Sequence, residues 1–367
     1  MNLYIIKNEK KMILPEQIRD EIKYERMTKE IKSRKKKLLI IEGGLHKVHD
    51  VYYRLLEKDF DIEVITSDER DVGENIITWH PRRYKIISDS FTSYNRLYDY
   101  FKNYDIIAVR TWYRLYSLQA LLHCFWHKKK FVVLEEQRND PHKLFERIVF
   151  KIWKAFIKPL INLKGDPIIC TTFSCFDYMN DSGFKNIEYV PVPYEPKVKK
   201  PKKYKKLRIL CVARFEWLKD HKTLIKALKE VDIDYELTLV GEGSLKGETM
   251  LIGKDMNIKF IDSIPNNKID KFYQKHNLFV LPSRSDPVGM VVFEAMSNGL
   301  PCIISENVGA GRDINYPSSF RFESGNYKEL AYCIRHWEEL DGKESLKILK
   351  EIHNPKKIKK QLISVLS

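Results

Sequence analysis

The sequence has no apolar stretch long enough to cross a membrane. Its start, MNLYIIKNEKKMILPEQ, lacks the long apolar core of a secretory signal. None of its six cysteines has the spacing of a zinc or redox pair, and most lie in apolar runs such as IICTTF and LRILCVARF. We therefore expect buried, reduced thiols in a cytoplasmic protein, either free in the cytoplasm or peripheral at the inner face of the membrane.

Acidic residues are fewer than basic ones. The 367-residue chain has 65 Lys and Arg against 50 Asp and Glu, which gives a formal net charge of +15. Such a surface favours anionic partners, namely phosphates, acidic lipid headgroups, nucleic acid or anionic glycans. Charge alone does not choose among these partners, and a general richness in lysine explains it equally well. The length suits two domains, and 43% hydrophobic residues provide material for two cores.

Short apolar runs alternate with helix-like segments along most of the chain. Residues 37–194 contain KLLIIEGG, YDIIAVRTW and KFVVLEEQ, and residues 207–345 contain LRILCVARF, YELTLVGEG and LFVLPS. This alternation predicts an α/β fold whose parallel strands are covered by helices on both faces. We expect two Rossmann-like, doubly wound domains that face each other across a cleft and bind ligands at the carboxyl ends of their strands.

Three segments lie outside these two expected domains. Residues 1–36 form a highly charged N-terminal extension, to which we assign no chemistry. Residues 195–206, EPKVKKPKKYKK, have the Lys and Pro content of a solvated linker, with a nucleic-acid patch as the alternative from composition. Residues 346–367 predict a C-terminal helix.

The segment LFVLPSRSDPVGMVVFEAMSNGLPCIIS predicts a strand, a loop and a helix. Asp286 lies in the loop, and Glu294 lies eight positions later, within the helix. The helix start offers free backbone N–H groups and the positive end of the helix dipole, which suit a phosphate. The two carboxylates can accept hydrogen bonds from sugar hydroxyls on either side of that phosphate. The pattern therefore predicts a nucleotide-sugar site, although two unrelated surface acids are the plainer interpretation.

This segment resembles the E-x7-E motif of glycosyltransferase family 4 and related retaining GT-B enzymes, and GMVVFEAMSNGLPCI is similar to the family pattern. The resemblance covers residues 207–335 well and implies a GT-B fold. It also implies that Glu294 binds the nucleotide ribose and that Asp286 contacts the transferred sugar. Asp286 departs from the family, which usually has a Glu there, and its side chain is one methylene shorter.

Two cations precede this motif. VARFEWLKDHKTLIKAL is similar to the family's strand–loop–helix segment, in which an Arg and a Lys five positions apart bind the diphosphate. Arg214 and Lys219 occupy those positions. Two fixed cations can stabilise the charge of a leaving nucleoside diphosphate without a metal. We therefore predict Asp286, Arg214 and Lys219 as catalytic residues, with no metal and no cofactor. Ordinary surface charges are the alternative for Arg214 and Lys219.

Further donor-binding residues follow from loops that match the family in order. VGEGSL resembles a glycine turn after a strand, and NIKFIDSI matches the segment whose backbone reads the nucleobase. The first domain matches only in outline. There, Gly43 and Gly44 correspond to the glycine loop after the first strand, although a tight turn explains them equally well. The predicted donor-binding residues are Glu294, Gly289, Met290, Val291, Gly241, Ile261, Ser263, Gly43 and Gly44.

One first-domain position stays open. The family often has a His near the end of a later first-domain strand, where this sequence reads VVLEEQRND. Glu136 or Gln137 stands in its place, and the sequence does not say whether either acts in catalysis.

A helical segment, FERIVFKIWKAFIKPL, has a basic face and an apolar face. It is either a basic amphipathic helix on an anionic membrane or a core-packed helix with a solvated face. The membrane interpretation assigns residues 145–160 as the contact and favours a lipid-linked acceptor. The basic face contains Arg147, Lys151, Lys154 and Lys158, and the apolar face contains Ile148, Val149, Ile152, Trp153 and Phe156.

These observations predict a metal-independent glycosyltransferase. We expect it to move a sugar from a nucleotide-sugar, a UDP- or GDP-sugar, to a glycan or lipid-linked acceptor with retention of configuration. The C-terminal domain would hold the donor and the N-terminal domain the acceptor. The alternatives are a nucleotide-sugar epimerase and a non-catalytic GT-B binding module. The predicted donor-site residues argue against nucleic acid as the partner. The sequence specifies neither the sugar, the nucleobase nor the acceptor.

Overall fold

The computed structural model describes most of the chain. The described residues are 4–7, 10–13, 35–42, 47–66, 84–86, 97–98, 100–110, 112–136, 144–196, 204–313 and 319–367. Gly43, Gly44, Gln137 and residues 197–203 of the predicted linker lie outside these ranges. Of the N-terminal extension, the structure describes an antiparallel pair of strands, β1 (Tyr4–Lys7) and β2 (Lys10–Ile13), and the residues that lead into the next strand.

The N-terminal half is built on a seven-stranded sheet in which every neighbouring pair is parallel. Its strand order is β5-β4-β3-β6-β7-β8-β9, so the chain starts in the middle of the sheet and winds outward twice, which is the Rossmann order. The strands are β3 (Lys36–Glu42), β4 (Phe60–Thr66), β5 (Tyr84–Ile86), β6 (Ile106–Arg110), β7 (Lys130–Glu135), β8 (Ile168–Cys170) and β9 (Ile187–Tyr189).

Helices cover both faces of this sheet, because both faces of β3 are apolar. Leu38 and Ile40 pack into one hydrophobic cluster, and the alternate residues Leu39 and Ile41 pack into another. The covering helices among the described residues are α2 (Lys47–Leu56), α5 (Leu115–Trp126), α6 (Leu144–Lys164) and α7 (Phe173–Asp181).

Helix α6 departs from the prediction for its apolar residues. Four of the five residues assigned to its apolar face are exposed, namely Ile148, Val149, Ile152 and Phe156. The side chains that α6 buries in the core are instead Phe150, Ile157 and Ile161, with Trp153 packed beside them. Helix α6 is therefore packed on the core, as one of its two interpretations expects, but mainly through side chains other than those assigned to its apolar face.

The C-terminal half repeats the same topology in a six-stranded, parallel sheet of order β12-β11-β10-β13-β14-β15. Its strands are β10 (Leu207–Val212), β11 (Tyr235–Val240), β12 (Ile258–Ile261), β13 (Leu278–Leu281), β14 (Cys302–Ser305) and β15 (Ser319–Phe322). Its helices are η1 (Trp217–Lys219), α8 (His221–Lys229), α9 (Lys246–Ile252), α10 (Asn266–Tyr273), α11 (Met290–Ser297), α12 (Gly309–Asp313), α13 (Tyr327–Arg335) and η2 (Trp337–Glu339). The expected α/β architecture of two Rossmann-like halves is confirmed.

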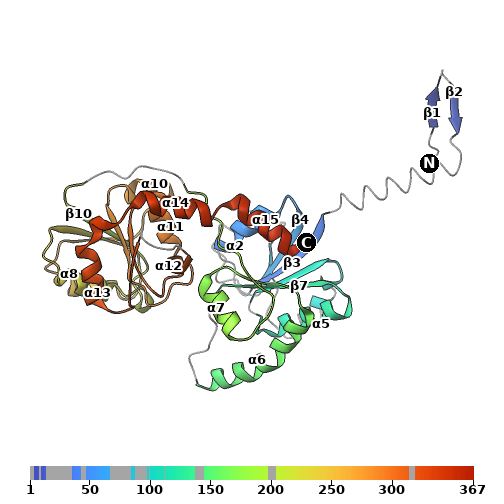
Figure 1. Cartoon of the computed structure of the whole chain (residues 1–367), viewed down its shortest axis with the longest axis horizontal. Coiled ribbons are helices and arrows are strands. Elements are labelled where there is room, and N and C mark those ends of the chain that lie inside the picture. The colour runs from blue at the N-terminus through green and yellow to red at the C-terminus, as the bar shows by residue number, and fades with distance from the viewer. Residues whose placement is uncertain are drawn as a thin grey trace.

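The last two helices connect the halves. Helix α14 (Gly342–Ile352) packs on α11 in the C-terminal half, and α15 (Pro355–Leu366) packs on α2 in the N-terminal half (Figure 1). A new helix starts at Pro355 because the Asn354 side chain accepts hydrogen bonds from two backbone N–H groups of its first turn. No helix in the described ranges has the length and apolar character needed to cross a bilayer.

His353 is the joint between α14 and α15. Its ring is fully buried against Phe293, and its Nδ1 donates to the carbonyl oxygen of Val192 at 2.7 Å. The backbone N–H of Tyr194 donates to the carbonyl oxygen of His353 at 2.9 Å. Burial lowers the pKa of His353 to about 4. The joint therefore requires a neutral imidazole.

We predict that His353→Asn makes the protein less sensitive to acid. The unfolded chain takes up a proton at His353 near pH 6.5 while the folded protein does not, so this group destabilises the fold progressively as the pH falls from 6.5 to about 4. The full effect is roughly 3 kcal/mol. Asn keeps a donor for Val192 but does not titrate. Tm measured at pH 7.5 and pH 5 should fall less in His353→Asn than in the wild type. His336→Asn is the matched control, because His336 also donates through Nδ1 to a carbonyl oxygen, that of Tyr332, but is only half-buried. Equal losses of Tm in wild type and His353→Asn would contradict this role.

Candidate functional site

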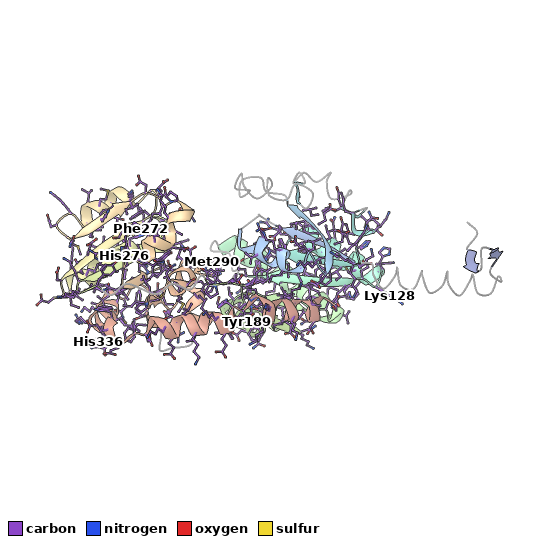
Figure 2. The ribbon with its side chains drawn as sticks, turned by 90° about the horizontal axis from the view of Figure 1, so that it is seen from above. Lys128, Tyr189, Phe272, His276, Met290 and His336 are labelled. Carbon is purple, nitrogen blue, oxygen red and sulfur yellow. The ribbon has the colours of Figure 1, made fainter. Side chains whose placement is uncertain are left out.

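The predicted donor residues follow the carboxyl ends of adjacent strands. Ile261 is the last residue of β12, and the loops after β12, β11, β10 and β13 contain, in that order, Ser263, Gly241, Arg214 with Lys219, and Asp286. In a parallel sheet all these ends lie on one edge, so residues that are distant in the sequence share one side of the C-terminal half. Met290, at the start of α11, is labelled in Figure 2 and lies where the two halves meet.

Asp286 is bonded to three separate loops. Its Oδ2 accepts a hydrogen bond from Lys219 Nζ at 2.7 Å, and its Oδ1 accepts from the backbone N–H of Gly289 at 2.9 Å. Its backbone N–H donates to Asn307, and its carbonyl oxygen accepts from Gly309. The short side chain of Asp reaches the backbone N–H three residues later, which fixes the entry into α11. The structure thus brings Asp286, Lys219 and Gly289 together.

Glu294 lies on α11, and its carboxylate is hydrogen-bonded to a buried tyrosine of α10. Its Oε2 accepts a hydrogen bond from the hydroxyl of Tyr273 at 2.8 Å, and Tyr273 is fully buried. Burial, together with the neighbouring Glu294 carboxylate, raises the pKa of Tyr273 well above its usual value, so the phenol stays protonated and keeps donating. The interaction restricts Glu294 to one position. No spacing in the sequence indicated Tyr273, because its role depends on the packing of α10 against α11.

Two glycines of the site occupy positions where a side chain would collide with neighbouring atoms. Gly289 has a φ of +72° at the N-cap of α11, and a Cβ there would approach Val308 Cγ1 to 2.7 Å. Gly241 has a φ of +152°, and a Cβ there would collide with the carbonyl oxygen of Ala213. At both positions the backbone passes close to a neighbouring segment of the protein. Met290 and Val291 form the first turn of α11, and Ser263 is exposed in the loop after β12.

Arg214 has a different environment from Lys219. Its side chain is 72% exposed, and its guanidinium pairs with Glu216 at 2.9 Å. The two predicted cations therefore differ in their contacts. Lys219 pairs with Asp286, whereas Arg214 pairs with Glu216 at the surface.

A cavity of about 800 Å³ lies between the halves, and Asp286 is part of its wall. This volume falls within the ~300–1,000 Å³ usual for small-molecule sites. The N-terminal half contributes residues of α6 and α7, and the C-terminal half contributes the loops after β13 and β14. Polar side chains dominate the lining, which includes Lys154, Ser174, Asp177, Tyr178, Asp181, Arg284, Asp286, Glu306 and Asn307.

Arg284 is a cavity residue that the sequence did not indicate. Its guanidinium pairs with Asp220 at 2.9 Å and lies 5.1 Å from the centre of the Trp217 ring. Its backbone N–H donates to the carbonyl oxygen of Leu218. Arg284 therefore attaches the loop that carries Lys219 to the loop that carries Asp286.

The N-terminal half has a buried charged cluster at the carboxyl ends of β3, β6 and β7. Glu42 accepts hydrogen bonds from His49 Nδ1 and Arg110 Nε, both at 3.0 Å, and Glu136 accepts from His49 Nε2 at 2.7 Å. Burial opposes these charges, but the two cations outweigh it and lower the pKa of Glu42. The two carboxylates likewise outweigh burial and raise the pKa of His49. Each charge thus has an opposite partner. Glu136, one of the two residues left open by the sequence, belongs to this cluster.

The C-terminal half is similar to known glycosyltransferases. Residues 195–354 match the family model described as Glycosyl transferases group 1. "Putative glycosyltransferase EpsF" of Bacillus subtilis is 35% identical over 104 residues, which cover 26% of this chain and 27% of that protein. An uncharacterized 41.2 kDa protein in the cps region of Klebsiella pneumoniae is 24% identical over 229 residues, or 57% of this chain and 62% of that protein. The matches thus span about a quarter and somewhat under two thirds of these relatives' lengths.

Solved structures extend the likeness to both halves. Anabaena Alr3699/HepE in complex with UDP has a TM-score of 0.72 at 14% identity and covers 90% of this chain and 99% of that chain. The lipopolysaccharide outer core galactosyltransferase WaaB has a TM-score of 0.71 at 17% identity with the same coverage. At such identities the likeness concerns the fold. The chain therefore has the GT-B fold, and its residues 195–354 match the family model of glycosyl transferases group 1.

Proposed function

We propose that the protein transfers a sugar from a nucleotide-sugar to a glycan or lipid-linked acceptor with retention of anomeric configuration. The observation that carries this proposal is the cluster of Asp286, Lys219 and Gly289 at the start of α11, with Glu294 inside the same helix. It provides a cation, free helix N–H groups and two carboxylates within one site, which matches the parts of a nucleotide-sugar. Neighbours with this fold were solved with UDP and with UDP-glucose.

The diphosphate of the donor would lie at the N-terminus of α11. Lys219 would exchange its bond to Asp286 for a bond to the phosphate, and the exposed Arg214 would turn in from the surface. Both cations then stabilise the charge that develops as the bond between the sugar and the diphosphate breaks. Asp286, released from Lys219, would accept a hydrogen bond from the transferred sugar. The leaving phosphate takes the proton of the acceptor hydroxyl.

The acceptor would enter the cavity between the halves. Asp177, Asp181 and Glu306 offer carboxylates for sugar hydroxyls, and Ser174 and Tyr178 offer hydroxyl groups. These side chains come from both halves, so closing the halves on the acceptor would align it with the donor and exclude water. A polar, hydroxyl-rich acceptor suits such a lining better than an apolar one.

We predict that Glu294→Ala loses nucleotide-sugar binding. The lost hydrogen bond to a charged group corresponds to an affinity at least about tenfold weaker. Thermal shift with UDP-glucose and GDP-mannose measures the change. Glu248→Ala is the matched control, because it removes an exposed carboxylate that pairs with Lys222 outside the site. It should retain binding within about threefold. If neither donor stabilises the wild type, or if Glu294→Ala binds as well as the wild type, the donor site is assigned wrongly.

A second prediction concerns Lys219. Lys219→Met should lower the release of nucleoside diphosphate from the donor by about 10²-fold or more, because one of the two charges opposite the leaving group is lost. Lys222→Met removes a nearby cation that instead pairs with the exposed Glu248, and it should leave turnover unchanged. Steady-state assays of diphosphate release compare the two variants. Equal turnover in both variants would refute the assignment of Lys219.

Retention is tested on the product. A donor whose sugar is α-linked to the diphosphate should give an α-linked product, which the anomeric proton in a nuclear magnetic resonance spectrum identifies. A β-linked product would show inversion and remove this part of the proposal.

A further inference from the structure

Helix α6 has three distinct faces. At about 100° per residue, Phe150, Ile157 and Ile161 fall on one side and are buried in the core. A second stripe is apolar but exposed, with 49% to 75% of each side chain open to solvent: Ile148, Val149, Ile152, Phe156 and Leu163. Between the two lies a basic flank of Arg147, Lys151, Lys154 and Lys158. Figure 1 shows α6 along the outer edge of the N-terminal half.

Such a stripe differs from the scattered apolar residues found on most protein surfaces. Single exposed apolar residues are common in folded proteins, but five on one helix stripe form a continuous apolar surface. The adjoining helix α5, which packs against α6, also exposes Leu115, Leu122 and Trp126. This part of the N-terminal half therefore presents large apolar side chains that its own core does not use.

The charges beside the stripe indicate which partner binds to it. Arg147 and Lys151 are exposed on the flank, where they can reach anionic headgroups while the apolar stripe enters the lipid boundary. The whole chain carries a net charge of +15, so a second copy of the protein would bring like charge against like charge. We propose that α6 docks on the surface of an anionic lipid bilayer.

The same helix leads to the cavity. Lys154 and Lys158 turn away from the stripe and bond to Ser182 at the end of α7, through Oγ at 2.6 Å and through the carbonyl oxygen at 3.1 Å. Lys154 and Ser182 both line the cavity. The cavity thus lies across α6 from the docked stripe, about one helix diameter, ~10 Å, from the bilayer.

The distance of the cavity from the bilayer indicates the class of acceptor. A sugar carried on a lipid rises from the bilayer as a polar headgroup and can enter a cavity at that height, whereas its anchor stays in the membrane. The acceptor is therefore a lipid-linked sugar. This second step rests on the proposed glycosyl transfer, whereas membrane docking does not.

The test is co-sedimentation of the full chain with vesicles. The wild type should bind vesicles of phosphatidylcholine with phosphatidylglycerol at least about tenfold better than vesicles of phosphatidylcholine alone. Phe156→Ser with Leu163→Ser should lose at least about tenfold of this binding, because the apolar stripe is interrupted. Arg147→Glu with Lys151→Glu should remove the preference for anionic lipid. The matched control is Leu251→Ser on α9, whose side chain is as exposed as that of Leu163.

Three outcomes would overturn the docking proposal. They are no binding of the wild type to anionic vesicles, unchanged binding of the Phe156→Ser/Leu163→Ser variant, or a dimeric wild type that this variant converts to a monomer in light scattering. Thermal shift with UDP-glucose is measured on the same variants and should be unchanged. If the protein binds vesicles but no nucleotide-sugar, the docking proposal stands and the proposed glycosyl transfer is refuted. The two proposals can therefore fail separately.

Discussion

The carboxylate of Asp286 holds the C-terminal site together. It joins the loop after β10, through Lys219, to the start of α11, through Gly289, while its backbone joins both to the loop after β14. Beyond the strand ends, the sheet ladder among the described residues is reduced to one isolated bridge between Asp286 and Val308, so the half-buried Asp286 side chain supplies further bonds between the loops. Asp suits this role because its reach is short. The departure from the usual Glu of the family thus has a local structural reason.

The two sheets use the same edge in different ways. At the carboxyl ends of β3, β6 and β7, the N-terminal half pairs Glu42, His49, Arg110 and Glu136 with one another. Such a cluster is stable only when every buried charge keeps its partner, which makes this edge rigid. The C-terminal edge instead has a Lys219–Asp286 pair that a phosphate can replace, and an exposed Arg214. This contrast supports placing the donor in the C-terminal half.

Sequence reasoning succeeded where the relevant residues are close together in the chain. The strand, loop and helix around Asp286 and Glu294 were predicted because turn residues and apolar periodicity are local signals. Tyr273, Arg284 and Arg110 were missed because each acquires its role only when distant loops or helices pack together. For a related reason, the sequence did not decide which side of α6 packs on the core. Periodicity locates apolar stripes, but Ile152 and Phe156 look the same in sequence whether they face a core or the solvent.

The connection between the halves limits how they can move. Helix α15 packs on α2 while α14 packs on α11, so the halves are tied a second time at His353, close to Val192 and Tyr194 where the chain first leaves the N-terminal half. Two adjacent crossings can serve as a hinge, because rotation about their common line would leave both packed helices in place. If α6 lies on a bilayer, the N-terminal half is fixed there and the C-terminal half is the part that swings. Closure would then move Asp286 towards α7, which lines the part of the cavity that a lipid-linked acceptor would enter from the membrane.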